Sequence, residues 1–166
     1  MTIYHPSEDN PLSKLTSLGL TLPQVKNDPK YLNFRTSRDG QIYISGQLPY
    51  QNGSLAAQGL VGEKGSQGVD VEVAVAREMM LQATLNALAV AAEAVGGLKN
   101  LRVVQMLVFV ASAPGFSRHS HVADPGSELL IEVLSEYGRH ARTAIGVAGL
   151  PRNSPVEVQM VCEPRI

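Results

Sequence analysis

The chain has 166 residues, 44% of them hydrophobic and 17% charged, which is typical of a single compact domain with its own core. Its 14 Lys and Arg nearly balance its 15 Asp and Glu, so there is no basic excess to hold a nucleic acid backbone. Tryptophan is absent and aromatic residues make up 5%, so few side chains are available to stack on the bases of a single strand. Composition therefore argues against a nucleic acid partner.

Cysteine content and hydropathy bear on where the protein works. Cys162 is the only cysteine and cannot form a disulfide within the chain. Met1 is not followed by a basic segment and then an apolar one, the pattern of a secretory signal. Apolar runs such as residues 106–111 fall far short of the about 20 residues that span a bilayer. We expect a cytoplasmic protein with a reduced cysteine and no membrane role.

The first 30 residues are predicted to form an extended arm, and residues 31–166 a single domain. Prolines exclude a long helix in the arm, at Pro6, Pro11, Pro23 and Pro29. Two strands follow, at residues 32–37 and 41–47, and Asp39-Gly40 between them is typical of a hairpin turn.

A long alanine-rich helix is predicted after a glycine-rich connection that holds a short strand near Leu60. Asp70 is its expected N-cap, and Gly96-Gly97 is expected to end it. Small apolar residues recur every three or four positions, at Ala76, Met80, Ala83, Ala87, Val90 and Ala94. Such a narrow stripe lets a helix lie close on a flat sheet, so we interpret this helix as structural.

Residues 101–112 are almost continuously apolar and rich in β-branched residues, which predicts a central strand covered on both faces. A second helix is expected to begin at Asp124-Pro125 and to end at Gly138, with its apolar stripe at Leu129, Leu130, Val133, Leu134 and Tyr137. Strands at residues 142–148 and 155–162 complete the chain.

The order of these elements, β-β-α-β-α-β-β, predicts an α+β fold in which a mixed sheet is covered on one face by two helices. Two helices leave the other face of such a sheet without a layer of its own. We expect that face to be buried by oligomerisation.

The last two strands are predicted to pair as an antiparallel hairpin, with paired residue numbers that sum to about 303. Alternation then directs four residues to the core: Val156, Val158, Met160 and Cys162. If Thr143, Ile145 and Val147 face the same core, the opposite surface carries Arg142, Ala144, Gly146, Glu157 and Gln159. Arg142 and Glu157 would lie about 13 Å apart on it, leaving room for a ligand or a neighbouring subunit. The alternative is an ordinary solvent-exposed face.

Arg139, His140 and Arg142 crowd the start of the first of these strands. Cations this close either point apart into water or surround an anion. Arg139 fits the negative end of the preceding helix, and the role of His140 stays open. His119 and His121 alternate in a polar segment without a cysteine or a carboxylate pair, so we interpret them as solvated and predict no metal.

Five separated motifs together resemble the Rid family of reactive-intermediate deaminases, also called YjgF or L-PSP, over about residues 31–163. They are ISGQLP at 44–49, Ala76-Arg77 at the start of the long helix, ARTAIGV at 141–147, Leu150-Pro151 and VEVQMV at 156–161. The resemblance implies a chorismate-mutase-like fold of the bacillar type and a homotrimer whose sheets pack into a central barrel. It also implies three clefts between subunits that hydrolyse enamines and imines of small amino acids to 2-keto acids and ammonia, without a cofactor.

Carried over by position, the resemblance assigns the site residues. Arg142 falls on the family's carboxylate-binding arginine and Glu157 on the glutamate beside the reacting water. The residues expected to line the substrate cleft with Arg142 are Gly46, Ser45, Tyr31 and Ala144. Tyr31 would be the aromatic lid, and Ala144 replaces a cysteine that many active deaminases carry.

Two other functions are consistent with the same residues. A trimeric protein that binds small carboxylates without catalysis would need Arg142 but not Glu157. An endoribonuclease would need a basic cleft, for which Arg139, His140 and Arg142 are the candidates.

Overall fold

The computed structural model describes residues 10–165. A five-stranded mixed sheet has the order β1-β2-β7-β5-β6. Its strands are β1 Phe34–Thr36, β2 Ile42–Gln47, β5 Leu101–Ala111, β6 Ala141–Val147 and β7 Val156–Pro164. The short strands β3 Val61–Gly62 and β4 Val71–Glu72 form a separate parallel pair. The helices are α1 Pro11–Ser17, α2 Val73–Val95 and α3 His119–Leu134, and short 3-10 turns lie at Leu98–Asn100, Ser135–Gly138 and Pro151–Asn153.

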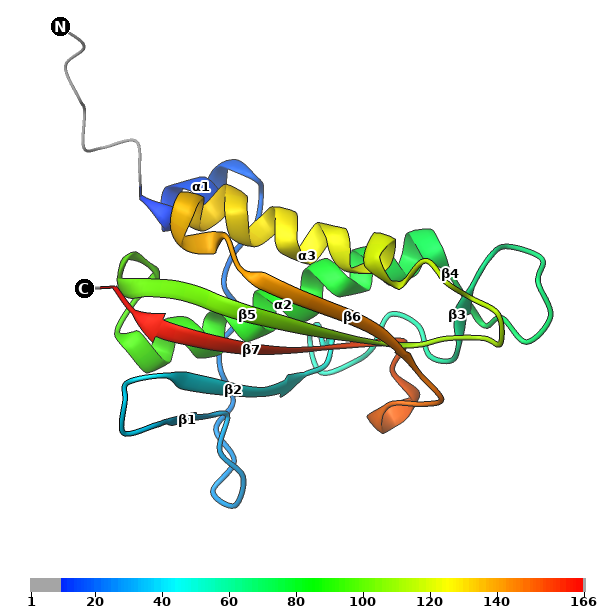
Figure 1. Ribbon diagram of the computed structural model, residues 1–166, viewed down its shortest axis with the longest axis horizontal. Coiled ribbons are helices and arrows are strands. Elements are labelled where there is room, and N and C mark those ends of the chain that lie inside the picture. The colour runs from blue at the N-terminus through cyan, green and yellow to red at the C-terminus, as the bar shows by residue number, and fades with distance from the viewer. Residues whose placement is uncertain (1–9, 166) are drawn as a thin grey trace, which may run out of the picture.

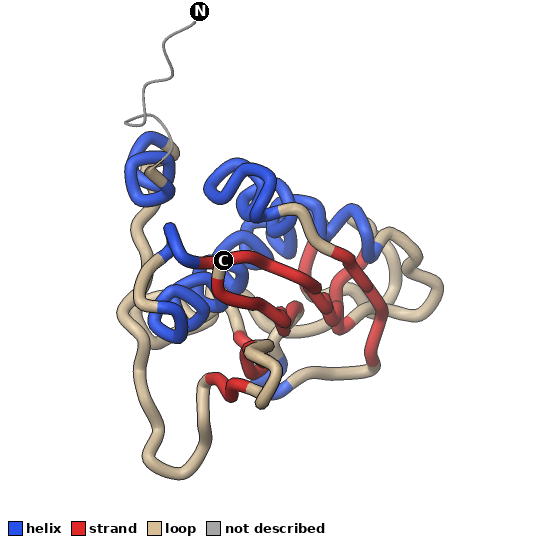
Figure 2. The backbone as a smooth tube through the Cα atoms, turned by 60° about the vertical axis from the view of Figure 1, so that its left-hand side comes forward, coloured by secondary structure: helices blue, strands red, loops and turns tan. Residues whose placement is uncertain are grey.

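Helices α2 and α3 lie side by side on one face of the sheet, which confirms the predicted α+β arrangement (Figures 1 and 2). The core lies between these two layers. Within residues 10–165 no element covers the other sheet face (Figure 2). In the same part of the chain, no helix combines the length and the apolar character needed to cross a membrane.

The β1–β2 hairpin forms as the Asp39-Gly40 motif predicts. The strands pair antiparallel from Phe34 opposite Ile44 to Thr36 opposite Ile42. Gly40 has a φ of 86° and donates its N–H to the Ser37 carbonyl at 3.2 Å, a conformation that glycine adopts without strain.

Helix α2 buries the predicted stripe of small residues, including Ala76, Met80, Ala83 and Ala87. It ends where expected, because Gly96 takes a left-handed conformation with a φ of 73°. The prediction that Asp70 caps this helix is wrong. The Asp70 carboxylate instead accepts the Leu60 N–H at 2.9 Å and so joins the two segments that lead into β3 and β4.

Helix α3 begins at His119, so the predicted start at Asp124-Pro125 is wrong and Pro125 lies inside the helix. A proline there cannot donate to the carbonyl of His121, four residues earlier. The guanidinium of Arg77 on α2 donates to that carbonyl instead. This substitute donor explains why the helix continues through a residue that usually ends one.

The N-terminal arm is not wholly extended, because α1 forms its first described segment. Asn10 caps this helix by accepting the Leu12 N–H at 3.0 Å, and Lys14 donates to Ser135 at the end of α3 at 2.7 Å. The following residues run without regular structure to the opposite edge of the sheet, where β1 begins (Figure 1).

The predicted hairpin between the last two strands is wrong. β5 lies between β6 and β7, antiparallel to β7 and parallel to β6. The reason is that β5, α3 and β6 form a strand–helix–strand unit, whose strands run parallel. β7 does turn its predicted residues to the core, but β6 is turned over: Arg142 lies beside Met106 on the helix-covered face, and Ile145 lies on the uncovered face.

Candidate functional site

Glu157 lies on β7, on the face of the sheet that no helix covers. Its cross-strand neighbour is Phe109 of β5, and its carboxylate lies against the backbone of Gly46 in β2. Burial raises the pKa of the Glu157 carboxyl above its usual value. Within residues 10–165 this carboxylate accepts no hydrogen bond, so a half-buried acid keeps its full capacity to accept from a ligand or a water.

Gly46 has no side chain and so leaves room for the Glu157 carboxylate. The pairing of β2 with β7 shifts register between Ile44 and Gln47, which places Gly46 in an irregular stretch. A methyl group at Gly46 would overlap the Glu157 carboxylate. Ser45 precedes it, and its hydroxyl accepts from the Gln47 side-chain amide at 3.1 Å. The structure therefore brings three of the predicted residues together: Glu157, Gly46 and Ser45.

Arg142 lies on the opposite face of the sheet, beneath α3. One terminal nitrogen of its guanidinium donates to the Asp124 carboxylate at 3.0 Å and to the Ser127 hydroxyl at 3.2 Å. The side chain is 26% exposed. Within the described chain the other guanidinium nitrogens make no hydrogen bond, so their N–H groups can meet a further acceptor.

Ala144 follows Arg142 on the same face of β6 and is half-buried. The room that the sequence predicts for a ligand along this surface is filled at Gly146. His119 and Ser112 occupy the space above Gly146, and their side chains form a hydrogen bond at 3.1 Å. His119 and His121, predicted to be solvated, both belong to the first turn of α3 and are only partly exposed.

The three crowded basic residues, Arg139, His140 and Arg142, take separate roles. Arg139 pairs with Glu136 at 3.0 Å in an exposed position at the end of the 3-10 turn after α3. His140 is half-buried, and its Nε2 lies 3.0 Å from the same Ser127 hydroxyl that accepts from Arg142. Sequence reasoning missed Asp124 and Ser127. The strand–helix–strand order was the signal that could have placed α3 above Arg142.

Tyr31 does not join either group. It precedes β1 at one edge of the sheet, whereas Arg142 lies on β6 at the other, about 19 Å away at about 4.8 Å per strand. The residue is 66% exposed, and the Lys30 ammonium lies over its ring, 5.1 Å from the ring centre. Within one chain Tyr31 cannot act as a lid over Arg142.

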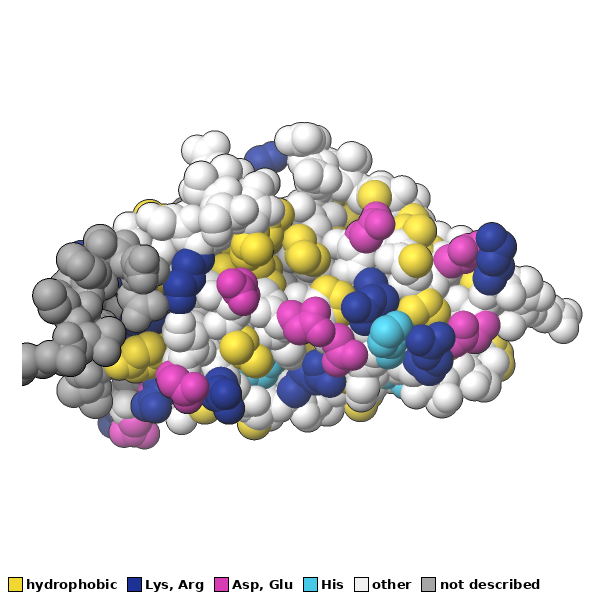
Figure 3. All heavy atoms as spheres, turned by 90° about the horizontal axis from the view of Figure 1, so that it is seen from above, with side chains coloured by type: hydrophobic (Ala, Val, Ile, Leu, Met, Phe, Trp, Pro, Cys, Tyr) yellow, Lys and Arg dark blue, Asp and Glu magenta, His cyan; other side chains and the backbone are white. Residues whose placement is uncertain are grey.

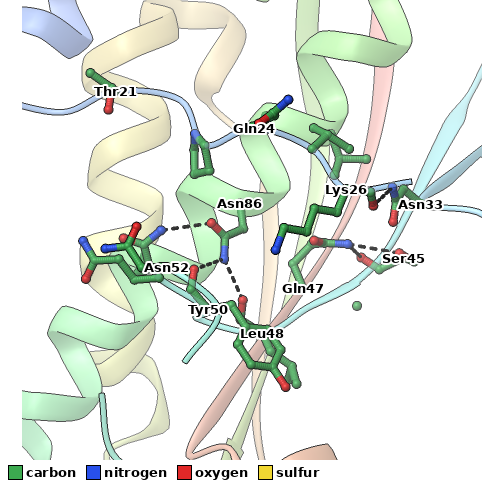
Figure 4. Close-up of a pocket in the computed structure, with 18 residues that line it drawn as sticks. Thr21, Gln24, Lys26, Asn33, Ser45, Gln47, Leu48, Tyr50, Asn52 and Asn86 are labelled. Carbon is green, nitrogen blue, oxygen red and sulfur yellow. Dashed lines mark hydrogen bonds between the residues drawn. The ribbon is translucent and has the colours of Figure 1, made fainter. Parts of the chain in front are cut away.

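An open cavity of about 920 Å³ lies between the arm, the end of β2 and α2. Ser45 and Gly46 line it, with side-chain amides that include Gln47 and Asn86 (Figure 4). Asn86 donates to the carbonyls of Leu48 and Tyr50 and so holds the loop after β2 against α2. The cavity thus borders the Glu157 group but does not reach Arg142.

Cys162 is no substitute for the cysteine that Ala144 replaces. It is buried in the core, as predicted, and burial raises its thiol pKa to about 12. Within residues 10–165, no three His, Cys, Asp or Glu side chains gather as metal ligands would.

The mixed sheet with two helices on one face places this chain in the chorismate-mutase-like class of α+β proteins. The chain matches the family described as "YjgF/chorismate_mutase-like, putative endoribonuclease" over residues 12–163. It therefore belongs to the YjgF family, which is also called Rid or L-PSP.

Individual relatives match almost the whole chain. Protein TCP17 of Trypanosoma cruzi is 37% identical over 154 residues, which cover 91% of this chain and 92% of the relative. The crystal structure of Atu1372 from Agrobacterium tumefaciens, a protein described as of unknown function, matches with a TM-score of 0.81 and 39% identity over 93% and 92% of the two chains. The crystal structure of a Shewanella oneidensis protein described as "a putative endoribonuclease" matches with a TM-score of 0.82 and 29% identity over 93% of this chain and 99% of that chain.

Proposed function

We propose that this protein hydrolyses enamine and imine derivatives of small amino acids to 2-keto acids and ammonia, at a site shared by two subunits of a homotrimer. The observation that carries the proposal is the unpartnered Glu157 carboxylate, whose pKa burial raises, beside the side-chain-free Gly46. Arg142 supplies the group that binds the substrate carboxylate, because guanidinium N–H groups that Asp124 and Ser127 do not use can donate to it.

The position of these two groups calls for two copies of the chain. Arg142 and Glu157 lie on opposite faces of one sheet, so one small ligand cannot contact both within a subunit. β6 is an edge strand, and Arg142 is therefore near a border that another copy can approach. The uncovered sheet face next to it carries a group of apolar side chains, Tyr43, Leu107, Phe109, Ile145 and Val161, beside polar ones such as Thr143 and Gln159.

An enamine takes a proton from solvent on carbon, or an imine on nitrogen, to give the iminium ion on which Arg142 and Glu157 act. Arg142 holds the substrate carboxylate through a planar fork that stays charged at any working pH. The iminium carbon takes the oxygen of a water while Glu157 takes the proton of that water, which leaves a neutral carbinolamine. Glu157 returns the proton to nitrogen, the hydroxyl gives its proton to solvent as the C=O bond forms, and the C–N bond breaks with its electron pair on ammonia.

We expect a homotrimer in solution because the apolar side chains on the uncovered sheet face need a cover and the site needs a second subunit. Multi-angle light scattering at micromolar concentration should give three times the mass of the chain. A monomer under these conditions would remove the shared site and the mechanism with it.

Gly46→Ala should slow imine hydrolysis about tenfold or more, because the new methyl group must push the Glu157 carboxylate from its place. Keto-acid release after a coupled serine or threonine dehydratase measures the rate. Gly149→Ala is the matched control, since nothing lies within 4 Å of the methyl group it would add. Equal rates in the two variants would mean that the Gly46 contact does not position Glu157.

The same coupled assay separates the proposed function from its rivals. A carboxylate-binding protein would leave the release of keto acid at the uncatalysed rate. An endoribonuclease would instead cut RNA, but basic and acidic side chains alternate on the helix-bearing side (Figure 3) and Arg142 already pairs with Asp124.

A further inference from the structure

A chain of hydrogen bonds connects Arg142 to the end of α3. The Arg142 guanidinium donates to the Ser127 hydroxyl at 3.2 Å, and the same hydroxyl lies 3.0 Å from Nε2 of His140. The other ring nitrogen of His140, Nδ1, lies 2.6 Å from the Gly138 carbonyl. These groups belong to α3, to β6 and to the turn between them. The series of hydrogen bonds therefore connects three segments to one guanidinium.

The Gly138 carbonyl at one end of this series only accepts, and the Arg142 guanidinium at the other end only donates. These two groups determine which atom donates in each hydrogen bond between them. A carbonyl only accepts, so Nδ1 of His140 must carry a proton toward Gly138. In neutral His140, Nε2 is then an acceptor, and the Ser127 hydroxyl donates to it at 3.0 Å rather than to the Met106 sulfur, a weaker acceptor 3.7 Å away. The oxygen of Ser127 is left free to accept from Arg142. Neutral His140 therefore orients Ser127 so that its lone pairs face Arg142.

We propose that His140, acting through Ser127, is a positioning residue that holds the Arg142 guanidinium for anion binding, and that it does so only in its neutral form. Protonated His140 donates from Nε2, so the Ser127 hydrogen must turn away and the oxygen must serve two cationic donors at once. The proposal rests on Arg142 being the anion-binding group of the proposed function.

The surroundings of His140 favour the neutral form. Burial lowers its pKa below the usual value, and the positive charge of Arg142 adds to this, while the bond to Gly138 acts in the opposite direction. On α3, Asp124 faces Arg142 with one oxygen and lies 3.7 Å from His121 Nδ1 with the other, and on the turn after α3 Glu136 and Arg139 pair with each other. Protonation is therefore expected as the pH falls through a value below 6.5.

The sign of the pH effect distinguishes positioning from simple charge. An added positive charge near Arg142 would by itself attract an anion more strongly at low pH. Loss of the Ser127 orientation would weaken binding instead. We therefore expect the affinity for pyruvate, which stays ionised in this range, to fall as His140 becomes protonated.

Calorimetric titration of the full-length protein with pyruvate across this pH range tests the proposal. Ser127→Ala should weaken binding about three- to tenfold at neutral pH and flatten the pH profile. His140→Gln keeps an acceptor that does not titrate, so neutral-pH affinity should persist without the acid loss. Ser127→Thr keeps the hydroxyl and should restore the wild-type profile. Arg139→Ala, which removes the neighbouring cation, is the control and should behave like the wild type.

Nitrogen NMR of the His140 ring gives a readout that does not depend on any ligand. The proposal requires the proton of the neutral ring on Nδ1, and a proton on Nε2 would overturn it. Pyruvate binding in Ser127→Ala with wild-type affinity and pH profile would also overturn it while leaving the proposed function intact. No binding of pyruvate to the wild type at any pH would instead overturn the anion site, and the positioning role with it.

Discussion

Replacing Arg142 by alanine should abolish the binding of a small 2-keto acid such as pyruvate. Arg142→Lys keeps the charge but loses the two-point fork, so we expect binding to weaken by about 1 to 3 kcal/mol. Calorimetric titration measures both effects. The melting temperature should change little, because the Arg142–Asp124 ion pair is partly exposed to solvent and such pairs contribute little to stability.

Arg139→Ala provides the matched control for this experiment. Arg139 lies three residues from Arg142 in the sequence, yet its charge pairs with Glu136 in an exposed position. Its removal should alter pyruvate affinity only slightly. If wild type and Arg142→Ala bind pyruvate equally well, Arg142 is no anion site, and its role is limited to its bonds to Asp124 and Ser127.

Replacing Glu157 by glutamine should slow imine hydrolysis by about a hundredfold or more and preserve the trimer. The amide is nearly isosteric but cannot take a proton from water. Stability at neutral pH should stay the same or rise slightly, because burial disfavours the charged form of Glu157. The coupled dehydratase assay and light scattering measure the two properties on the same sample.

The pH profile of the wild type gives an independent check on Glu157. Its carboxyl pKa lies above 4.5, and a general base works only when ionised. At saturating substrate, where a change in affinity has no effect, the rate should therefore fall as the pH drops through that raised pKa, and the Glu157→Gln variant should lack this limb. Unchanged turnover in Glu157→Gln would reduce Glu157 to a structural role and favour a carboxylate-binding protein.

Local patterns in the sequence determine most of the secondary structure and one side of the site. The Asp39-Gly40 turn and the alanine stripe that stops at Gly96 act over a few residues, and the structure confirms both. Alternation along β7 likewise places Cys162 in the core and Glu157 outside it, because the side-chain period of a strand is independent of its partners.

Tertiary structure alone decided which strands are neighbours, and with them the face that Arg142 occupies. The apolar pattern of β6 suits either of its faces, because Ala144 and Gly146 alternate with Ile145 and Val147 and give no strong preference. The crossover through α3 makes β6 the parallel neighbour of β5 and puts Arg142 under Asp124 and Ser127. Strand pairing depends on contacts between residues far apart in the chain, which alternation within one strand does not encode.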